Sequence, residues 1–379
     1  MKLPELRLLA FSRAAGTPLL CLALLVPGCG KREDRAAPIK VGAVLFLTGP
    51  AASYGETQKN AFEIAKDEIA RGGGIKGRPL EIVYEDSAHD TAKAVAAVKK
   101  LATVDGVAMI VEVTGSDEAL AVAPFISEEK IPVLSAVDSS PKLSGVSPYF
   151  FRVVPSDLYQ GRFLAEWARD MAWKSAAILY VDNEWGIGLS AAVKDTFVSA
   201  GGTIAALVSS PDGASDFASQ LAKIDEAKPD GVFLLLYPQD AGRALKQTHD
   251  LGLKLGFLGG DPLSGEEVAT IAGEAVSGLM YCLPTRGKGP AFDAFVKKYK
   301  EKHGSEPNAN GVKSYDALMI AAEALRAEGT DRDGIRGFLA ELKAYQGASG
   351  NITLDKQGDL ESQRYDRFVY RDGVAKKMD

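Results

Sequence analysis

The chain has 379 residues, of which 46% are hydrophobic, 25% charged and 8% aromatic. This is a globular composition, long enough for two lobes with separate cores. The 44 basic and 50 acidic residues give a formal net charge of −6. Because no basic block stands out, nucleic-acid binding has no electrostatic support, and we interpret the acidic excess as favouring solubility.

The first 28 residues are predicted to be a signal peptide outside the fold. Three basic residues precede an apolar run over residues 19–26, which is too short to span a bilayer. The run leads into Val26-Pro27-Gly28-Cys29, which resembles the lipobox of bacterial lipoproteins. We therefore expect lipidation of Cys29, which would anchor the protein to a membrane. The alternative is a plain secretory signal with an incidental cysteine.

The mature chain is expected to begin with a charged tether over residues 29–38. Cleavage would leave Cys29 and Cys282, of which the first would be lipidated. We therefore expect no internal disulfide, so stability must come from the cores.

From residue 39, short aliphatic runs alternate with segments of helical period. The first series predicts strands and helices in turn at 39–47, 61–69, 80–85, 91–103, 107–113, 117–130 and 131–135. Ser53 to Glu56 forms a capping-box pattern at the start of the first helix, and Gly72-Gly73-Gly74 is expected to end it.

A second series follows Phe150 to Pro155, with helical segments between its strands. Its strands are predicted at 176–181, 203–208, 232–237, 257–258 and 278–283. A third segment over 292–342 is mostly helical, and strands at 351–354 and 367–370 end the chain. Strands alternating with helices predict parallel sheets covered on both faces, and two series predict two doubly wound α/β lobes.

Ligands of open α/β sheets bind beyond the carboxyl ends of the strands, where the chain enters the helices. The loops expected there cover residues 48–55, 114–116, 137–140, 182–186, 237–240 and 259–261.

Three kinds of group meet in these loops. Ser116 and its neighbouring amides open a helix and could hold a carboxylate without a basic side chain. Asp261 ends a strand of the other series and could hold an ammonium group, while Tyr54, Trp185 and Tyr237 could form aromatic walls. A zwitterion with an apolar side chain would satisfy all three. A single serine or aspartate at the end of a strand, taken alone, is more often a helix cap.

Other chemistries find no support in the sequence. There is no phosphate-binding loop, dinucleotide fingerprint or Gly-x-Ser-x-Gly elbow, and the three histidines are scattered. Cys282 lies in an apolar run typical of a core. We expect no catalytic residue, no metal and no cofactor.

A set of short motifs, in one order from residue 39 to 362, resembles the branched-chain amino-acid (leucine/isoleucine/valine) binding proteins, type I periplasmic binding proteins of ABC importers. The motifs include Ile39–Val44, Thr48-Gly49-Pro50, Tyr54-Gly55-Glu56, Gly73–Arg78, Phe151-Arg152, Trp185–Leu189, Lys228-Pro229-Asp230, Leu258–Asp261, Gly273–Gly278 and Gly358-Asp359.

The resemblance implies a Venus-flytrap fold, in which three crossings join the lobes. Lobe 1 would hold residues 39–154 and 284–350, and lobe 2 residues 155–283 and 351–379. It also implies a role for each site residue. The ligand carboxylate would be held by Thr114, Gly115, Ser116, Asp138 and Ser139, the ammonium by Asp261, and the side chain by Tyr54, Trp185, Tyr237 and Tyr315.

The sequence departs from the family pattern in three respects. Ala88 and Thr114 stand where some members have a disulfide, and Glu112 replaces a usual glycine or proline. Asp138 replaces a small residue, and its carboxylate would repel a ligand carboxylate by about 1–4 kcal/mol. Either Asp138 turns away, or the ligand carries a donor or cation at that end.

The resemblance implies a monomeric, non-enzymatic, extracytoplasmic binding protein that delivers an amino-acid-like ligand to an ABC permease with its ATPase subunits. A branched-chain amino acid is the first expectation, and an amide, urea or aromatic acid the alternative. A ligand-sensing receptor subunit and an enzyme on the same scaffold are the other classes considered. A receptor would need a membrane-spanning helix, and no apolar run of the mature sequence is long enough.

Overall fold

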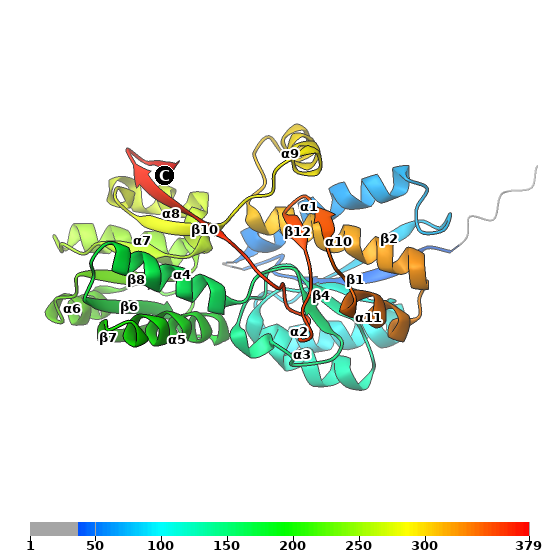
Figure 1. Cartoon of the computed structure of the whole chain (residues 1–379), viewed down its shortest axis with the longest axis horizontal. Helices are drawn as coiled ribbons and strands as arrows, with labels where there is room; N and C mark the ends of the chain where they lie inside the picture. The colour runs from blue at the N-terminus through cyan, green and yellow to red at the C-terminus, as the bar shows by residue number, and fades with distance from the viewer. Residues whose placement is uncertain (1–36, 50, 379) are drawn as a thin grey trace, which may run out of the picture. The chain divides into compact units, whose positions relative to one another are not determined.

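The computed structural model describes residues 37–49 and 51–378 (Figure 1). The predicted signal peptide, Cys29 and most of the predicted tether lie outside these residues. Within the described part of the chain, no helix has the length and apolar character needed to cross a membrane.

Lobe 1 is built on a five-stranded sheet with the order β2-β1-β3-β4-β5. All of its pairings are parallel. The strands are β1 (Ile39–Leu45), β2 (Leu80–Asp86), β3 (Ile110–Val113), β4 (Val133–Ser135) and β5 (Phe150–Arg152). The near-continuous burial of β1, β3, β4 and β5 explains their uninterrupted apolar runs, whereas the edge strand β2 is only partly buried.

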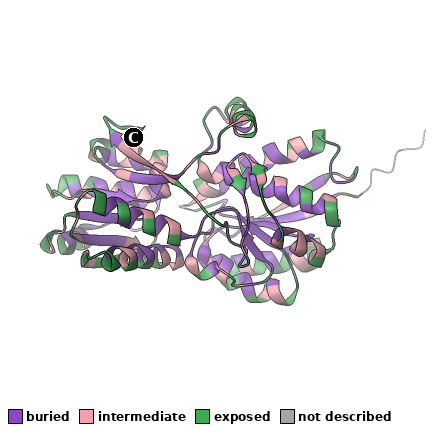
Figure 2. Ribbon diagram, in the orientation of Figure 1, coloured by how far each residue is buried: buried purple, intermediate pink, exposed green. Residues whose placement is uncertain are grey.

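Helices cover both faces of this sheet (Figures 1 and 2). One core cluster joins the sheet to α1 (Ala52–Arg71), α9 (Pro290–His303), α10 (Ala309–Glu328) and α11 (Arg332–Ala340). The other joins it to α2 (Thr91–Lys100), the π-helical turn Leu101–Asp105 and α3 (Ser116–Glu128). The chain therefore returns to lobe 1 after it has built most of lobe 2.

Lobe 2 has a seven-stranded sheet with the order β14-β13-β10-β9-β8-β6-β7. The strands are β6 (Ser175–Val181), β7 (Thr203–Ser210), β8 (Gly231–Leu235), β9 (Phe257–Gly259), β10 (Met280–Pro284), β13 (Tyr365–Arg371) and β14 (Val374–Lys377). The strands β7-β6-β8-β9-β10 repeat the order of lobe 1, and β13 and β14 add an antiparallel extension.

The lobe 2 helices share one core cluster with this sheet. They are α4 (Asp157–Asp170), α5 (Glu184–Ser199), α6 (Ala218–Glu226), α7 (Pro238–Asp250) and α8 (Glu266–Ala272), and short 3₁₀ turns cover Asp261–Ser264 and Gly273–Val276. Another 3₁₀ turn, Pro141–Leu143, belongs to lobe 1, where Leu143 is buried. A small hairpin pairs β11 (Tyr345–Gly347) with β12 (Gly350–Ile352). The prediction of two doubly wound parallel-sheet lobes is confirmed.

Local predictions differ from the structure at three places. Helix α1 begins at Ala52 with no side-chain cap, so the capping box predicted at Ser53 and Glu56 is wrong, whereas the glycines after Arg71 do end the helix. The helix predicted over 91–103 changes at Leu101 into a π-helical turn. Phe150–Arg152 forms a strand that the sequence analysis did not separate from the crossing after it.

The last crossing between the lobes also lies later than predicted. Ile352, Leu354 and Leu360 are buried in the core cluster of lobe 1, and β13 of lobe 2 begins only at Tyr365. The predicted boundary at 350/351 rested on the small residues Gly350 and Asn351, but these belong to the β11–β12 hairpin. Packing of the three apolar side chains, which the sequence analysis had assigned to lobe 2, moves the crossing to the segment after Leu360.

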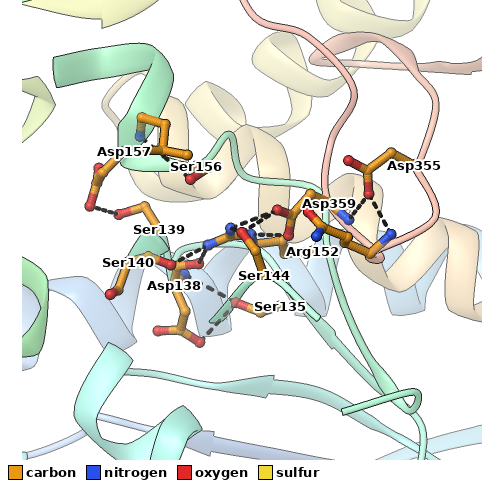
Figure 3. Close-up of polar contacts among 12 residues, drawn as sticks. Ser135, Asp138, Ser139, Ser140, Ser144, Arg152, Ser156, Asp157, Asp355 and Asp359 are labelled. Atoms are coloured by element: carbon orange, nitrogen blue, oxygen red, sulfur yellow. Dashed lines mark hydrogen bonds and ion pairs between the residues drawn. The ribbon is translucent and has the colours of Figure 1, made fainter. Parts of the chain in front are cut away.

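Arg152 ties this last segment to the loop that follows β4 (Figure 3). Its side chain is fully buried and forms a two-pronged ion pair with Asp359, at 2.6 and 3.0 Å. Its Nη1 donates to the carbonyl oxygens of Asp138 (3.1 Å) and Ser140 (2.8 Å). One guanidinium group thus fixes the backbone beside predicted ligand residues to a segment about two hundred residues later.

We predict that Arg152→Ala lowers the free energy of unfolding by about 3–5 kcal/mol, because it leaves Asp359 and two carbonyl oxygens buried without their donor. Chemical denaturation measures the change. Arg286→Ala is the control, since Arg286 pairs with Glu306 at the surface and should contribute at most about 1 kcal/mol. Equal effects of the two substitutions would contradict the assignment.

Candidate functional site

The polar residues of interest lie where strands of both sheets run into helices. In lobe 1 these are the segments after β1, β3 and β4, and in lobe 2 those after β6, β8 and β9. In each lobe the first and third strands in sequence order lie side by side in the sheet, and the chain leaves them in opposite directions. Such a switch point is where doubly wound sheets bind ligands.

The start of α3 is closed by a carboxylate of the protein itself. The Gly115 amide donates to Oδ1 of Asp138 at 2.7 Å, and Ser135 Oγ donates to Oδ2 at 2.8 Å. Gly115 has φ +109°, and a Cβ there would lie 1.9 Å from Glu118 Oε2, so only glycine fits. Asp138 therefore turns toward the start of α3. There it accepts a hydrogen bond from the Gly115 amide, which the sequence analysis had expected to bind the ligand.

Asp138 forms a buried acid pair with Glu112. Both are about 1% exposed or less, and burial is the main reason why the pKa of each is raised. The charge of Asp138 raises the pKa of Glu112 further, so Glu112 is the member of the pair that keeps a proton. Glu112 also accepts from Gln58 (3.0 Å) and from the Ala136 amide (2.8 Å).

Thr114 and Ser116 are also committed to internal contacts. Thr114 Oγ1 donates to Gln58 Oε1 at 2.8 Å, and Ser116 Oγ accepts from the Ser140 amide at 3.3 Å. The Thr114 bond ties the segment after β3 to α1, and the Ser116 bond ties the start of α3 to the loop after β4.

Asp261 lies in a second carboxylate cluster. Gln160 Nε2 donates to its Oδ1 at 2.7 Å. Burial raises the pKa of Asp261, and the hydrogen bond from Gln160 partly opposes this rise. The neighbouring Asp157 accepts from Ser139 Oγ at 3.0 Å. Burial and then the charge of Asp261 raise the pKa of Asp157 to about 8. Ser139 of lobe 1 is thus linked through Asp157 to Asp261.

Lys313 is a buried cation within electrostatic range of Asp261. Its Nζ donates to the Val153 carbonyl at 3.3 Å. Burial lowers its pKa to about 8, although Asp316 and Asp261 favour the charged form. Asp316 is in turn bound to the Ala348 and Ser349 amides. The cluster therefore contains more acidic than basic groups.

Three aromatic side chains lie at the starts of helices, Tyr54 in α1, Trp185 in α5 and Tyr237 just before α7. Trp185 stacks on Tyr237 with ring centroids 4.9 Å apart, and Tyr54 meets the edge of Tyr237 at 6.0 Å. His89 lies 5.9 Å from Tyr237 and 4.4 Å from Phe46. The three aromatic residues predicted to form walls are thus brought together.

Next to these rings is a small hollow of about 20 Å³, partly open to solvent. Its lining includes Tyr54, Tyr237, Asp212, Asp240 and Glu267. Arg243 pairs with Asp240 at 2.8 Å. The hollow is therefore bordered by aromatic faces and by carboxylates, of which Asp240 is already paired.

Polar contacts connect the lobes around this region. His89 Nδ1 lies 2.8 Å from Asp212 Oδ2, and Lys142 Nζ lies 2.6 Å from Glu184 Oε2. The Glu184 amide, at the start of α5, donates to the carboxylate of Asp117 at 3.2 Å. Lobe 1 side chains thus reach across to two strand ends of lobe 2.

Tyr315 is the predicted site residue that the structure does not bring to this region. It lies in the lobe 1 core, where its ring is 4.4 Å from that of Phe295 and its hydroxyl donates to Glu68 at 3.0 Å.

Four residues of the region were missed by the sequence analysis. His89 and Asp212 follow the edge strands β2 and β7, and the strand-end rule had been applied only to inner strands. Asp157 and Gln160 start α4 after the first crossing, and no local pattern separates them from an ordinary helix beginning. They matter because folding places them beside Asp261.

Comparison with known proteins agrees with this arrangement of sheets. Residues 38–365 match the model of a family described as periplasmic binding protein. The Leucine-, isoleucine-, valine-, threonine-, and alanine-binding protein of Pseudomonas aeruginosa is 27% identical over 93% of this chain and 94% of its own. The Leu/Ile/Val-binding protein of Escherichia coli K12 is also 27% identical, over 92% of this chain and 94% of its own. The crystal structure of a leucine binding protein from Thermotoga maritima has a TM-score of 0.85 at 26% identity, covering 90% of this chain and 98% of that one.

Fold and site together define a two-lobed solute-binding protein. The chain belongs to the periplasmic binding protein family, and the predicted resemblance to its branched-chain amino-acid binding members is confirmed.

We predict that the His89–Asp212 pair stabilises the fold at low pH and not at high pH. Burial opposes a charge on His89, but Asp212 outweighs it and the pKa is raised. The stabilisation is then complete below the ordinary histidine pKa, near 6.5, and is lost as pH rises through the raised value.

Asp212→Asn should therefore reduce the free energy of unfolding by about 0.5–1 kcal/mol near pH 6 and much less near pH 8.5. Denaturation at both pH values measures it. His249→Gln, which changes an exposed histidine on α7, is the control and should show no such difference. A loss for Asp212→Asn that is the same at both pH values would refute the ion pair.

Proposed function

We propose that this protein is an extracytoplasmic solute-binding lipoprotein of an ABC importer that captures an amino-acid-like ligand when its lobes close. The family and the names of the relatives support the transport role, with branched-chain amino acids as the first candidates. Residues that belong to different lobes but lie in contact, such as His89 and Asp212, support capture between the lobes.

The position of Asp261 is the observation that carries the ligand class. Its carboxylate lies at the end of β9 within electrostatic range of Tyr54 of lobe 1, and one of its oxygens accepts from Gln160. A buried acid whose charged form is disfavoured gains most from a cation, because an ammonium group replaces the lost hydration. The ligand would then lie with its amine at Asp261 and its side chain against Tyr54, Tyr237 and Trp185.

The site favours binding over catalysis. Its acids are held by hydrogen bonds to backbone amides and to side-chain hydroxyls, as at Asp138 and Asp157. Delivery to a permease with its ATPase subunits, by a monomer held at the membrane through lipidated Cys29, completes the proposal.

We expect Asp261→Ala to weaken binding of any amine-bearing ligand by about 30-fold or more, because a buried charge pair loses one partner. Calorimetric titration with a panel of amino acids and amino-acid amides measures the change. Asp225→Ala removes the same charge from the exposed face of α6 and should leave affinity unchanged. Wild-type protein that binds none of the panel would overturn the proposed ligand class.

The lipid anchor has its own test. Cys29→Ser should shift the protein from the membrane to the soluble fraction of an expressing bacterium and abolish incorporation of labelled palmitate. Cys282→Ser, a change at a buried thiol, is the control and should remain at the membrane. Labelling that persists without Cys29 would refute the anchor.

A further inference from the structure

The proposed function leaves open what the ligand presents to lobe 1, at the end away from its amine. We propose that this end donates hydrogen bonds and carries no free carboxylate, so that the ligand is an amino-acid amide or a similar amine with a second N–H group. The inference rests on the proposed function and specifies the ligand of that same site.

The first observation is that the start of α3 is filled by carboxylates of the chain. The Gly115 amide donates to Asp138 at 2.7 Å. Asp117 and Glu118 lie in the first turn of α3. Each carboxylate contacts the backbone amide of its own residue. This contact opposes the rise in pKa that burial causes in each side chain. Amides that would hold a ligand carboxylate are therefore already bound to protein oxygens.

The second observation is that Asp138 is fixed in this role. Its side chain accepts from Gly115 and from Ser135, and its own amide donates to Ser135 Oγ at 3.1 Å. Arg152 holds its carbonyl oxygen from the other side (Figure 3). A ligand carboxylate would have to displace Asp138 against all of these bonds.

The third observation is a pair of buried acceptor atoms with no hydrogen-bond partner among the described residues. They are Oε2 of Glu118, whose residue is 1% exposed, and Oε1 of Gln160, whose residue is 3% exposed. The Gln160 amide is oriented by the bond from its Nε2 to Asp261, so its oxygen must face elsewhere, toward Gly260. Native proteins rarely leave buried acceptors unmatched, and ligand N–H groups would match both.

The two atoms lie in different lobes and in different parts of the site. Glu118 Oε2 lies beside Gly115 in lobe 1, within electrostatic range of His89 and Asp138. Gln160 Oε1 lies beside Asp261 in lobe 2. A ligand with an amine at Asp261 and an N–H group at its other end would meet an unmatched acceptor at each end.

Charge around Glu118 argues in the same direction. The groups that face it are His89 from the loop after β2, Asp117 from its own helix, Asp138 from the loop after β4 and Tyr237 at the start of α7. His89 is already paired with Asp212. A ligand carboxylate would be one more anion among acids that burial already disfavours in their charged form.

The experiment compares each amino acid with its own amide, using leucine, alanine and phenylalanine and the corresponding L-amides. Each pair shares the amine and the side chain and differs only in the second end. We expect calorimetric titration of the full-length protein in detergent to give an affinity at least about tenfold higher for the amide of the pair that binds best.

Variants of Asp138 test the cause. Asp138→Ser frees the Gly115 amide and removes the charge, so the preference should shift toward the free acid by about tenfold or more. Asp138→Asn keeps the shape of the side chain and should shift the preference in the same direction if the serine variant folds poorly. Asp225→Asn, at the exposed α6 position, is the matched control and should keep the wild-type preference.

The outcomes separate the two proposals. Amide preference that weakens in both Asp138 variants supports the inference. A free amino acid that binds wild-type protein as tightly as its amide overturns the inference and leaves the proposed function intact. Absence of binding for all three pairs overturns the proposed function together with the inference.

Discussion

The buried ion pair between Arg152 and Asp359 is the constraint on which the site depends. Arg152 ends β5, at the point where the chain first leaves lobe 1, and Asp359 lies just before it leaves lobe 1 for the last time. The same guanidinium holds the carbonyl oxygens of Asp138 and Ser140. Two crossing segments and one loop of the candidate site therefore share a single set of hydrogen bonds. If the lobes close as we propose, this anchoring would let the loop keep its geometry while the lobes change position.

The same part of the protein contains several buried carboxyl groups whose charged forms would be more stable in water. Glu112, Glu118, Asp138, Asp157 and Asp261 all have raised pKa values, and burial is the first cause for each. Such an arrangement reduces the stability of the unliganded fold. Positive charge and protons offset this loss of stability. They come from His89, from Lys313, from the proton held by the Glu112–Asp138 pair and, in our proposal, from the ligand amine. Functional sites commonly carry strain of this kind.

Much of the fold could be predicted from the sequence because it follows from local patterns. Buried aliphatic runs such as Val232 to Leu236 can be recognised as central strands, and a run of three glycines such as the one after Arg71 favours a helix end. Long-range packing was harder to predict. The crossing after Leu360 depends on which core buries three apolar side chains, and the neighbours of Asp157 depend on the meeting of two lobes. In the site, the sequence indicated that Asp138 was unusual, but the direction of its side chain is set by Gly115, Ser135 and Arg152 together.

The order in which lobe 1 receives its parts has a consequence for synthesis. Its sheet is complete at Arg152, yet α10, which packs on α1 in the same core, ends only at Glu328, and Asp359 follows later still. A chain made from its N-terminus therefore carries a parallel sheet with one face covered only in part, by α1, and an unpaired internal arginine until α10 and Asp359 have been made. Lobe 2 can condense meanwhile around β6 to β10. The first lobe to be made is the last to be finished, and until then the apolar surface of its sheet is open to wrong association.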